Sequence, residues 1–267
     1  MEKTILVTGA TDGIGLETAR MLTSLGHTVL LHGRNPAKLE KVEKELSADG
    51  RHVESYGADL SRMADVEALA EAVKAKHTKL DVLINNAGVF KTSDPITADG
   101  LDVRFVVNAI APYLLTQRLL PLIPTSGRII NLSSAAQSPV QLEALTGKKQ
   151  LPQDFSAYAQ SKLALTMWSR SMALALGKEG PAVIAVNPGS MLGSKMVKQA
   201  FGVAGGDIRI GADILTRAAS ADEFADASGQ YFDNDSGQFT SPHPDALNPQ
   251  KTEEVVSTIK EILAKIA

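Results

Sequence analysis

The stretch TILVTGATDGIG, residues 4–15, decides the fold. It starts as a short apolar run with β-branched side chains, which is typical of a strand buried in a parallel sheet. Gly9, Gly13 and Gly15 then form a turn into a helical pattern. Such a turn lets the backbone approach a phosphate, and the helix N-terminus supplies free N–H groups. The G-x-x-x-G-x-G spacing differs from the commoner G-x-G-x-x-G, yet it predicts nucleotide binding; the alternative is a tight turn without a ligand.

Further apolar runs continue this pattern along the chain. Candidate strands lie at residues 28–31, 52–56, 80–85, 127–133 and 182–187, and helical segments separate them. The alternation predicts an α/β protein with a single-domain Rossmann fold, in which a doubly wound, mainly parallel sheet has about seven strands. Because no repeat or linker divides residues 1–267, we expect one NAD(P)-binding domain.

Residues 190–248 interrupt the alternation. They are rich in Gly, Ser, Asp and Pro, which predicts loops and turns. A final amphipathic helix is expected at about 250–266. Because long irregular segments often shape a binding site, we expect the substrate to lie against residues 135–155 and 190–245.

Composition excludes several classes of function. Apolar residues make up 44% of the 267 residues, the net charge is −3, and no block of Lys and Arg occurs, so neither nucleic acid nor an anionic membrane is expected as a partner. The chain has no cysteine and its five histidines are scattered, so no metal site is predicted. A strand-like run begins at once, without room for a signal peptide, and no apolar run approaches the roughly 20 residues that cross a bilayer. We therefore expect a cytoplasmic protein without membrane insertion.

The segment FSAYAQSKLALTMWS, residues 155–169, carries a phenol and an ammonium on one helix face, because Tyr158 and Lys162 are four residues apart. A free tyrosine has a pKa of about 10, and a neighbouring ammonium lowers that pKa by favouring the phenolate. The pair can therefore act as a tuned proton donor and its cation. The alternative is an exposed helix pair with little energetic effect.

Five ordered motifs extend the argument to the whole chain. They are TGATDGIG, Asn85-Asn86-Ala87-Gly88, Ser133-Ser134, Tyr158-x-x-x-Lys162 and Asn187-Pro188-Gly189. In this order the chain resembles the short-chain dehydrogenase/reductase family. The spacing between Ser134 and Tyr158 and the segments GQYFDNDSGQF and SPHPDALNPQKTEEV are similar to the retinol-dehydrogenase-like branch.

The resemblance implies roles for individual residues. Tyr158 would be the general acid/base, Lys162 would tune it and hold a ribose, and Ser134 would polarise the carbonyl. Asn108 would help to position Lys162 through a water. The residues expected to bind the cofactor are Gly9, Thr11, Asp12, Gly13, Ile14, Gly15, Arg34, Asp59, Leu60, Asn86, Ala87, Gly88, Tyr158, Lys162, Pro188 and Gly189.

The end of the second strand indicates which nicotinamide cofactor is used. It reads Leu31-His32-Gly33-Arg34-Asn35 and lacks the acid that binds a ribose 2′-hydroxyl in NAD-specific folds. The planar donors of Arg34 suit a 2′-phosphate, which predicts NADP(H) in preference to NAD(H); the alternative is a solvated arginine. Asp12 lies where some NADP-preferring relatives have a basic residue, so no second basic contact is expected.

The predicted function is hydride transfer between a nicotinamide and an alcohol/carbonyl pair. An apolar aldehyde or ketone is the expected substrate, because the two substrate segments are rich in large apolar side chains. These are Val140, Leu142, Leu145, Leu151, Phe155, Met191, Leu192, Met196, Val197 and Phe201. A non-catalytic NADP(H)-binding regulator or redox sensor is the alternative, and a nucleotide-sugar epimerase is disfavoured by the glycine spacing. A homodimer or homotetramer through the helix of Tyr158 and Lys162 is also expected from the resemblance.

Overall fold

The computed structural model describes residues 2–266, with the side chains of all of these except Asp49, Ala200 and Phe201. The strands are β1 (Thr4–Val7), β2 (Thr28–Gly33), β3 (Val53–Gly57), β4 (Val82–Asn85), β5 (Arg128–Leu132), β6 (Ala182–Asn187), β7 (Tyr231–Asp233) and β8 (Gln238–Thr240). The helices are α1 (Gly13–Ser24), α2 (Pro36–Leu46), α3 (Met63–Lys76), α4 (Val103–Phe105), α5 (Ala111–Leu119), α6 (Leu142–Leu145), α7 (Asp154–Leu176), α8 (Lys195–Phe201), α9 (Arg209–Ser220) and α10 (Pro249–Ile266). A π-helical turn, Val106–Ile110, joins α4 to α5.

The eight strands form one sheet in the order β3-β2-β1-β4-β5-β6-β7-β8. All neighbouring strands are parallel except β7 and β8, which form an antiparallel hairpin. The chain builds outward from β1 to β3 and then restarts at β4 on the other side of β1. The prediction of a doubly wound, mainly parallel α/β sheet is confirmed, and β8 brings the count to eight.

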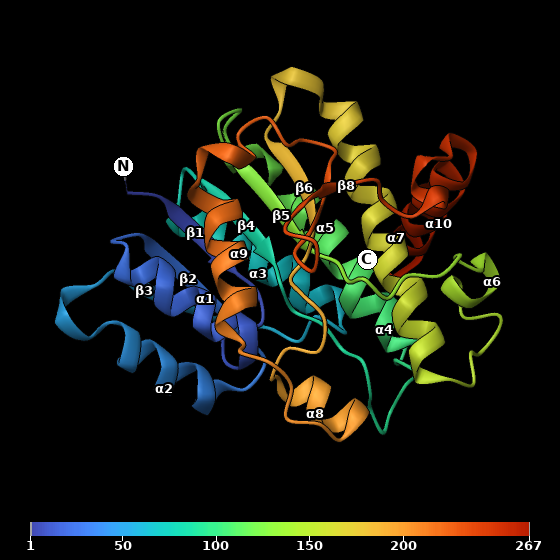
Figure 1. The fold of residues 1–267 in the computed structure, drawn as a ribbon, viewed down its shortest axis with the longest axis horizontal. Coiled ribbons are helices and arrows are strands. Elements are labelled where there is room, and N and C mark those ends of the chain that lie inside the picture. Colours follow the sequence, from blue (N-terminus) through green and yellow to red (C-terminus); the bar gives the residue numbers. More distant parts are fainter. Residues whose placement is uncertain (1, 267) are drawn as a thin grey trace.

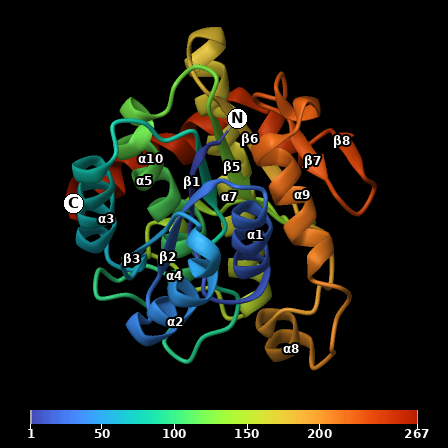
Figure 2. The same ribbon diagram turned by 90° about the vertical axis from the view of Figure 1, so that its left-hand side faces the viewer.

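Alternating side chains of the strands supply two hydrophobic layers. In β1, Leu6 faces the layer formed with α3, α5, α7 and α10, whereas Ile5 and Val7 face the layer formed with α1, α2 and α9. Leu83 and Ile84 divide in the same way in β4. Figures 1 and 2 show the two groups of helices on opposite sides of the sheet. Both faces are buried, which explains why the strands read as continuous apolar runs.

The prediction that residues 190–248 are loops and turns is wrong in part. They include α8, α9 and the β7–β8 hairpin. Helix α9 packs along α1, where Ala212, Leu215 and Ala219 are buried. The apolar residues of α9 lie on one face, which is buried against α1. The amphipathic pattern is thus present in the sequence, but the Gly-, Ser- and Asp-rich segments around it obscure it.

Helix α7 is enclosed by its own chain. Every residue from 159 to 169 is buried, and α10 packs along the helix through Val255, Val256 and Ile259. Figure 1 shows α10 beside α7. The surface that the sequence assigned to a partner subunit is therefore occupied in part by α10.

One described helical stretch, Val103–Leu122, is long and apolar enough to cross a membrane by length and composition, with a mean hydropathy of 1.2. Of the 18-residue apolar segment within this stretch, 72% is buried inside the described part of the structure. Phe105, Ile110 and Leu115 lie in the layer with α3 and α7, so packing in the core accounts for the apolar composition of this stretch.

Candidate active site

A cleft of about 870 Å³ opens at the carboxyl ends of the strands, where the chain restarts between β1 and β4. Ligands bind at this point in open α/β sheets. The cleft brings together all of the predicted cofactor residues and three of the four predicted catalytic residues, Ser134, Tyr158 and Lys162. Its lining includes Gly9, Thr11, Asp12, Gly13, Ile14, Gly15, Arg34, Asp59, Leu60, Asn86, Ala87, Gly88, Ser134, Tyr158, Lys162, Pro188 and Gly189. Asn108 is not among the lining residues and supports the cleft from behind.

The glycine turn at one end of the cleft has no room for side chains. A Cβ on Gly15 would lie 2.3 Å from the Gly9 carbonyl oxygen and 2.4 Å from Nδ2 of Asn86. Nδ2 of Asn86 donates to the carbonyl oxygens of Thr8 (2.7 Å) and Gly9 (3.2 Å), which fixes the turn against the end of β4. Asp12 caps α1 by accepting from the Gly13 N–H. This bare, rigid turn fits the diphosphate of a dinucleotide, because backbone can approach it closely.

His32 also fixes the turn, a role that none of the sequence motifs predicts. Its Nδ1 accepts from the Gly9 N–H (3.2 Å), so its Nε2–H donates to the Ala58 carbonyl oxygen (3.1 Å). Burial lowers the pKa of the His32 imidazole to about 4, which keeps the ring neutral at physiological pH. His32 thereby ties the glycine turn to the loop that carries Asp59. A histidine at the carboxyl end of a buried strand, next to a glycine turn, is the signal that could have identified it.

Two basic residues, Arg34 and Lys38, line the same end of the cleft as the glycine turn. Lys38, in the first turn of α2, is paired with Asp12, with 3.5 Å between Nζ and Oδ2. Lys38 thus brings a second basic side chain to this end of the cleft, and the expectation that a 2′-phosphate meets one basic contact there stays a prediction. Asp59 lies in a tight turn in which its Oδ1 accepts from both the N–H and the hydroxyl of Ser61.

At the opposite end of the cleft, Ser134, Tyr158 and Lys162 converge. The Ser134 side chain lies next to the Tyr158 phenol and favours its ionised form. Lys162 Nζ lies 5.6 Å from the centre of the Tyr158 ring and donates to the Leu132 carbonyl oxygen (2.7 Å). Ser133, by contrast, is buried and shares a 2.7 Å hydrogen bond with the Thr166 hydroxyl. Ser134 is therefore the hydroxyl of the pair that is available at Tyr158.

Burial dominates the ionisation of this pair in the chain by itself. It raises the pKa of the Tyr158 phenol, although the hydrogen bond from Ser134 opposes part of that rise. Burial also lowers the pKa of the Lys162 ammonium to about 7. In the chain without a bound cofactor the dry surroundings disfavour the charged form of both groups, and the lowered pKa expected for Tyr158 in the working site stays a prediction. Anionic groups of a bound ligand would favour the charged ammonium.

Replacing Lys162 with Met is expected to flatten the pH dependence of stability in the cofactor-free protein. Unfolded Lys162 has a pKa near its ordinary ~10.4, whereas the folded value is about 7. Between these values the unfolded chain binds more protons, so the free energy of unfolding rises with pH by up to about 1.4 kcal/mol per unit. Urea unfolding at several pH values from about 7.5 to 9.5 measures this slope. Lys41→Met, at an exposed position of α2, is the matched control, and parallel profiles for wild type and Lys162→Met would contradict the shifted pKa.

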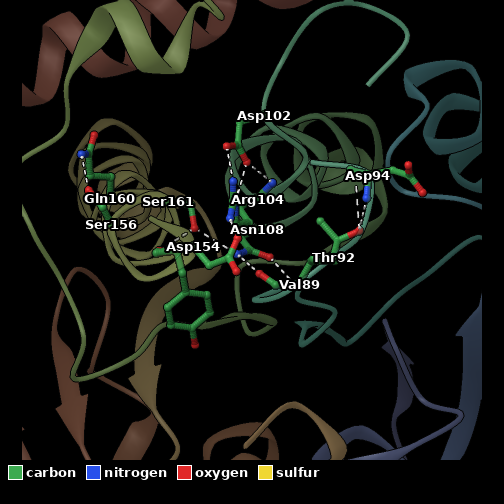
Figure 3. A network of polar contacts seen from close by, with 11 residues as sticks. Val89, Thr92, Asp94, Asp102, Arg104, Asn108, Asp154, Ser156, Gln160 and Ser161 are labelled. Atoms are coloured by element: carbon green, nitrogen blue, oxygen red, sulfur yellow. Dashed lines mark hydrogen bonds and ion pairs between the residues drawn. The ribbon is translucent and has the colours of Figure 1, made fainter. Parts of the chain in front are cut away.

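Asn108 lies in the π-helical turn and holds two backbone segments together (Figure 3). Its Oδ1 accepts from the Val89 N–H (2.8 Å), and its Nδ2 donates to the Val89 carbonyl oxygen and to the Ser161 hydroxyl, each at 2.9 Å. Turns of this kind are frequent at functional sites. The side chain is thus fully used in fixing the loop after β4 against α7. The predicted water between Asn108 and Lys162 stays a prediction.

The wall next to Tyr158 is apolar. The Phe90 ring lies 4.8 Å from the Tyr158 ring and 6.3 Å from the Phe155 ring, measured between centroids. Of the predicted substrate residues, Phe155, Met191, Leu192, Met196 and Val197 line the cleft. The side chain of Phe201 lies outside the described residues.

The other predicted substrate residues belong to the core. Leu145 is completely buried in the layer with α7 and α10, and Val140, Leu142 and Leu151 pack against that layer. Their assignment to the substrate pocket is wrong, because α6 turns its apolar side chains inward toward α10. Only Ala135, Ala136 and Phe155 of the 135–155 segment are among the described lining residues.

The β7–β8 hairpin braces the last wall of the cleft. Asp235 accepts from the N–H (2.7 Å) and the hydroxyl (2.6 Å) of Ser190 and from Nδ2 of Asn187 (2.9 Å). Asn234 Nδ2 donates to the Pro188 carbonyl oxygen (2.9 Å). Met191, which follows Ser190, has a φ of 53°. This left-handed conformation is strained for a side chain of this size, and strained residues cluster at functional sites.

Comparisons with known proteins agree with this geometry. The family model for short chain dehydrogenase matches residues 3–202. The chain therefore belongs to the short-chain dehydrogenase family, and it is an oxidoreductase that acts on CH–OH or C=O groups with a nicotinamide cofactor.

The curated relatives place the chain in the retinol-dehydrogenase-like branch of this family. Human retinol dehydrogenase 13 is 32% identical over 251 residues, covering 86% of this chain and 76% of that protein. Human retinol dehydrogenase 12 is 32% identical over 98% of this chain and 86% of that protein. Human polyprenol dehydrogenase is 34% identical over 70% of this chain and 60% of that protein.

Solved structures share the fold. A protein from Mycobacterium paratuberculosis has a TM-score of 0.81 at 26% identity and covers 97% of this chain and 92% of its own. The angucycline C-6 ketoreductase LanV with bound NADP has a TM-score of 0.70 at 30% identity, covering 87% of this chain and 93% of its own.

Proposed function

We propose that the protein is an NADP(H)-dependent reductase or dehydrogenase of apolar aldehydes, ketones and the matching alcohols, with Tyr158 as the general acid/base. The observation that carries this proposal is one continuous cleft of about 870 Å³, which runs from the glycine turn and Arg34 at one end to Tyr158 and Ser134 at the other. A nicotinamide cofactor bound along it supplies or accepts the hydride.

The chain's own side chains perform the proton transfer. In the reductive direction the Tyr158 hydroxyl donates a proton to the carbonyl oxygen, and in the oxidative direction the phenolate accepts it. The Ser134 hydroxyl, next to Tyr158, donates to the same substrate oxygen. The Lys162 ammonium, when charged, favours the phenolate and so brings the pKa of Tyr158 toward the working pH.

The apolar wall supports an apolar substrate. Phe90, Phe155, Met191 and Met196 lie around the approach to Tyr158, and thioether and aromatic side chains adapt to bulky apolar groups. The relatives' names, retinol dehydrogenase, polyprenol dehydrogenase and ketoreductase, support the same substrate class.

Oxidation of NADPH with a panel of aromatic, polyene and isoprenoid aldehydes and ketones tests the proposal, with NADH in parallel and charged sugars as the contrast. Turnover of apolar carbonyls with NADPH is the expected result. Tight NADPH binding without turnover of any member would instead support a non-catalytic regulator, and faster turnover of the sugars would contradict the apolar pocket.

Replacing Arg34 with Gln is expected to raise KM for NADPH roughly 10- to 100-fold and to leave KM for NADH within about twofold, because charge-assisted hydrogen bonds to the 2′-phosphate contribute roughly 1.5–3 kcal/mol. Lys38→Gln should act in the same direction with a smaller effect, since Lys38 is exposed and paired with Asp12. Steady-state kinetics with both cofactors measure the two ratios. Equal losses with NADH and NADPH would remove the basis for an NADP preference.

A further inference from the structure

We propose that Arg104 and Asp154 position Tyr158 by anchoring the first turn of α7, a role that rests on the proposed function of Tyr158. Arg104 lies in α4 and Asp154 is the first residue of α7. The two residues are 50 positions apart in the sequence and form an ion pair between Nη1 and Oδ1. Neither residue lines the cleft described above, so each acts through the helix and not on the substrate.

Arg104 is a rigid, buried anchor point. Its side chain is 3% exposed, and Asp102 fixes it with two hydrogen bonds, 2.8 Å to Nε and 2.6 Å to Nη2. Asp102 also caps α4 by accepting from the Arg104 N–H. The guanidinium fork is therefore already oriented when its remaining arm reaches Asp154, and little side-chain entropy is lost in forming that contact.

The start of α7 needs such an anchor. Gln153, at the cap position, makes no side-chain capping bond, and an uncapped helix end frays. Phe155, the next residue after Asp154, is half exposed and contacts the Phe90 ring only at its edge. Tyr158 follows one turn after Asp154 and would shift with any fraying of that turn.

A second anchor holds α7 on the C-terminal side of Tyr158, through Asn108 in the π-helical turn. Asn108 Nδ2 donates to the Ser161 hydroxyl (2.9 Å), and that hydroxyl donates to the Tyr158 carbonyl oxygen (2.7 Å). Figure 3 shows Arg104 with Asp154 and Asn108 with Ser161 side by side. Tyr158 thus lies between two fixed points of α7, both held by residues 104–108. This arrangement fixes the helix in position and in rotation at the turn that carries the phenol.

The test compares Asp154→Ala with Asp154→Glu and with a control, Glu67→Gln. Asp154→Ala leaves Arg104 paired with Asp102, so no buried charge is stranded and the protein stays folded. Glu67→Gln breaks the exposed ion pair between Arg118 and Glu67, which joins α3 to α5 away from the cleft. The measurements are kcat with the best carbonyl of the panel, Kd for NADPH, the unfolding midpoint, and amide hydrogen exchange of the peptide that covers 153–161.

Asp154→Ala is expected to lower kcat roughly 10- to 100-fold, since small displacements of a catalytic group have effects of this size. Kd for NADPH should stay within about twofold, the unfolding midpoint should fall no further than in Glu67→Gln, and exchange at 153–161 should accelerate. Asp154→Glu, which keeps the carboxylate, should recover most of kcat.

Three results would overturn the proposal. They are unchanged exchange at 153–161, unchanged kcat despite faster exchange, and equal losses in Asp154→Ala and Glu67→Gln. If the wild type turned over no carbonyl at all, the proposed function would fail and the positioning of a proton donor with it, whereas the exchange measurement would still report whether the pair anchors α7.

Discussion

Tyr158→Phe is expected to lower kcat for carbonyl reduction by about 10²- to 10⁴-fold, the range that a positioned general acid contributes. The substitution removes only the hydroxyl, so the ring keeps its contact with Phe90, 4.8 Å between centroids. Lys162 keeps its hydrogen bond to the Leu132 carbonyl oxygen. NADPH affinity should therefore stay within a few-fold, and the loss should lie in the chemical step.

Single-turnover oxidation of prebound NADPH measures that step directly. Tyr56→Phe is the matched control, because the Tyr56 hydroxyl is bonded to Glu54 on the edge strand β3, away from the cleft. A Tyr158→Phe enzyme that kept more than a tenth of wild-type kcat would show that another group delivers the proton. Ser134, the hydroxyl next to Tyr158, would be the next residue to replace.

Gly15→Ala is expected to abolish measurable NADPH binding, with Kd raised at least roughly 100-fold. The added Cβ would lie 2.3 Å from the Gly9 carbonyl oxygen and 2.4 Å from Nδ2 of Asn86, so the turn has to open. Opening it separates Asn86 from the Thr8 and Gly9 carbonyl oxygens. The backbone N–H groups expected to bind the cofactor phosphates would then lose their alignment, and such contacts are steeply sensitive to geometry.

Fluorescence titration with NADPH measures this effect. Gly57→Ala is the control, because a Cβ there meets no atom within 4 Å and Gly57 has no positive φ. Near-normal NADPH affinity in Gly15→Ala would mean that the phosphates lie elsewhere in the cleft, and the assignment of the glycine turn would have to be abandoned.

The order of the motifs in the sequence was enough to predict that they share one cleft. Gly9, Asn86, Ser134 and Pro188 each follow a strand, and parallel strands bring their carboxyl ends to one edge. The Tyr158 helix then needs only to pack beside β5 and β6 to complete the site. Periodicity and strand order carry this information, so the fold and the broad layout of the cleft were predictable.

Contacts between separate loops were not predictable in the same way. His32 is held by the loop after β3, through the Ala58 carbonyl oxygen, and Lys38 reaches the glycine turn from the first turn of α2, through Asp12. Leu145 and Met191 are both large and apolar, but one faces α10 and the other the cleft. Hydrophobicity favours burial of either residue and does not specify against which surface, which is decided by tertiary packing.

The enclosure of α7 has a consequence for how the protein is made. Residues 177–248 separate α7 from α10, so the ribosome delivers the helix with Tyr158 and Lys162 well before the helix that covers it. Until Val255 and Ile259 reach their places in the core, the apolar side of α7 that they bury stays open to water. The helix that carries Tyr158 and Lys162 is thus synthesised well before the helix that covers it, and a nascent chain completes the site only when α10 packs against α7.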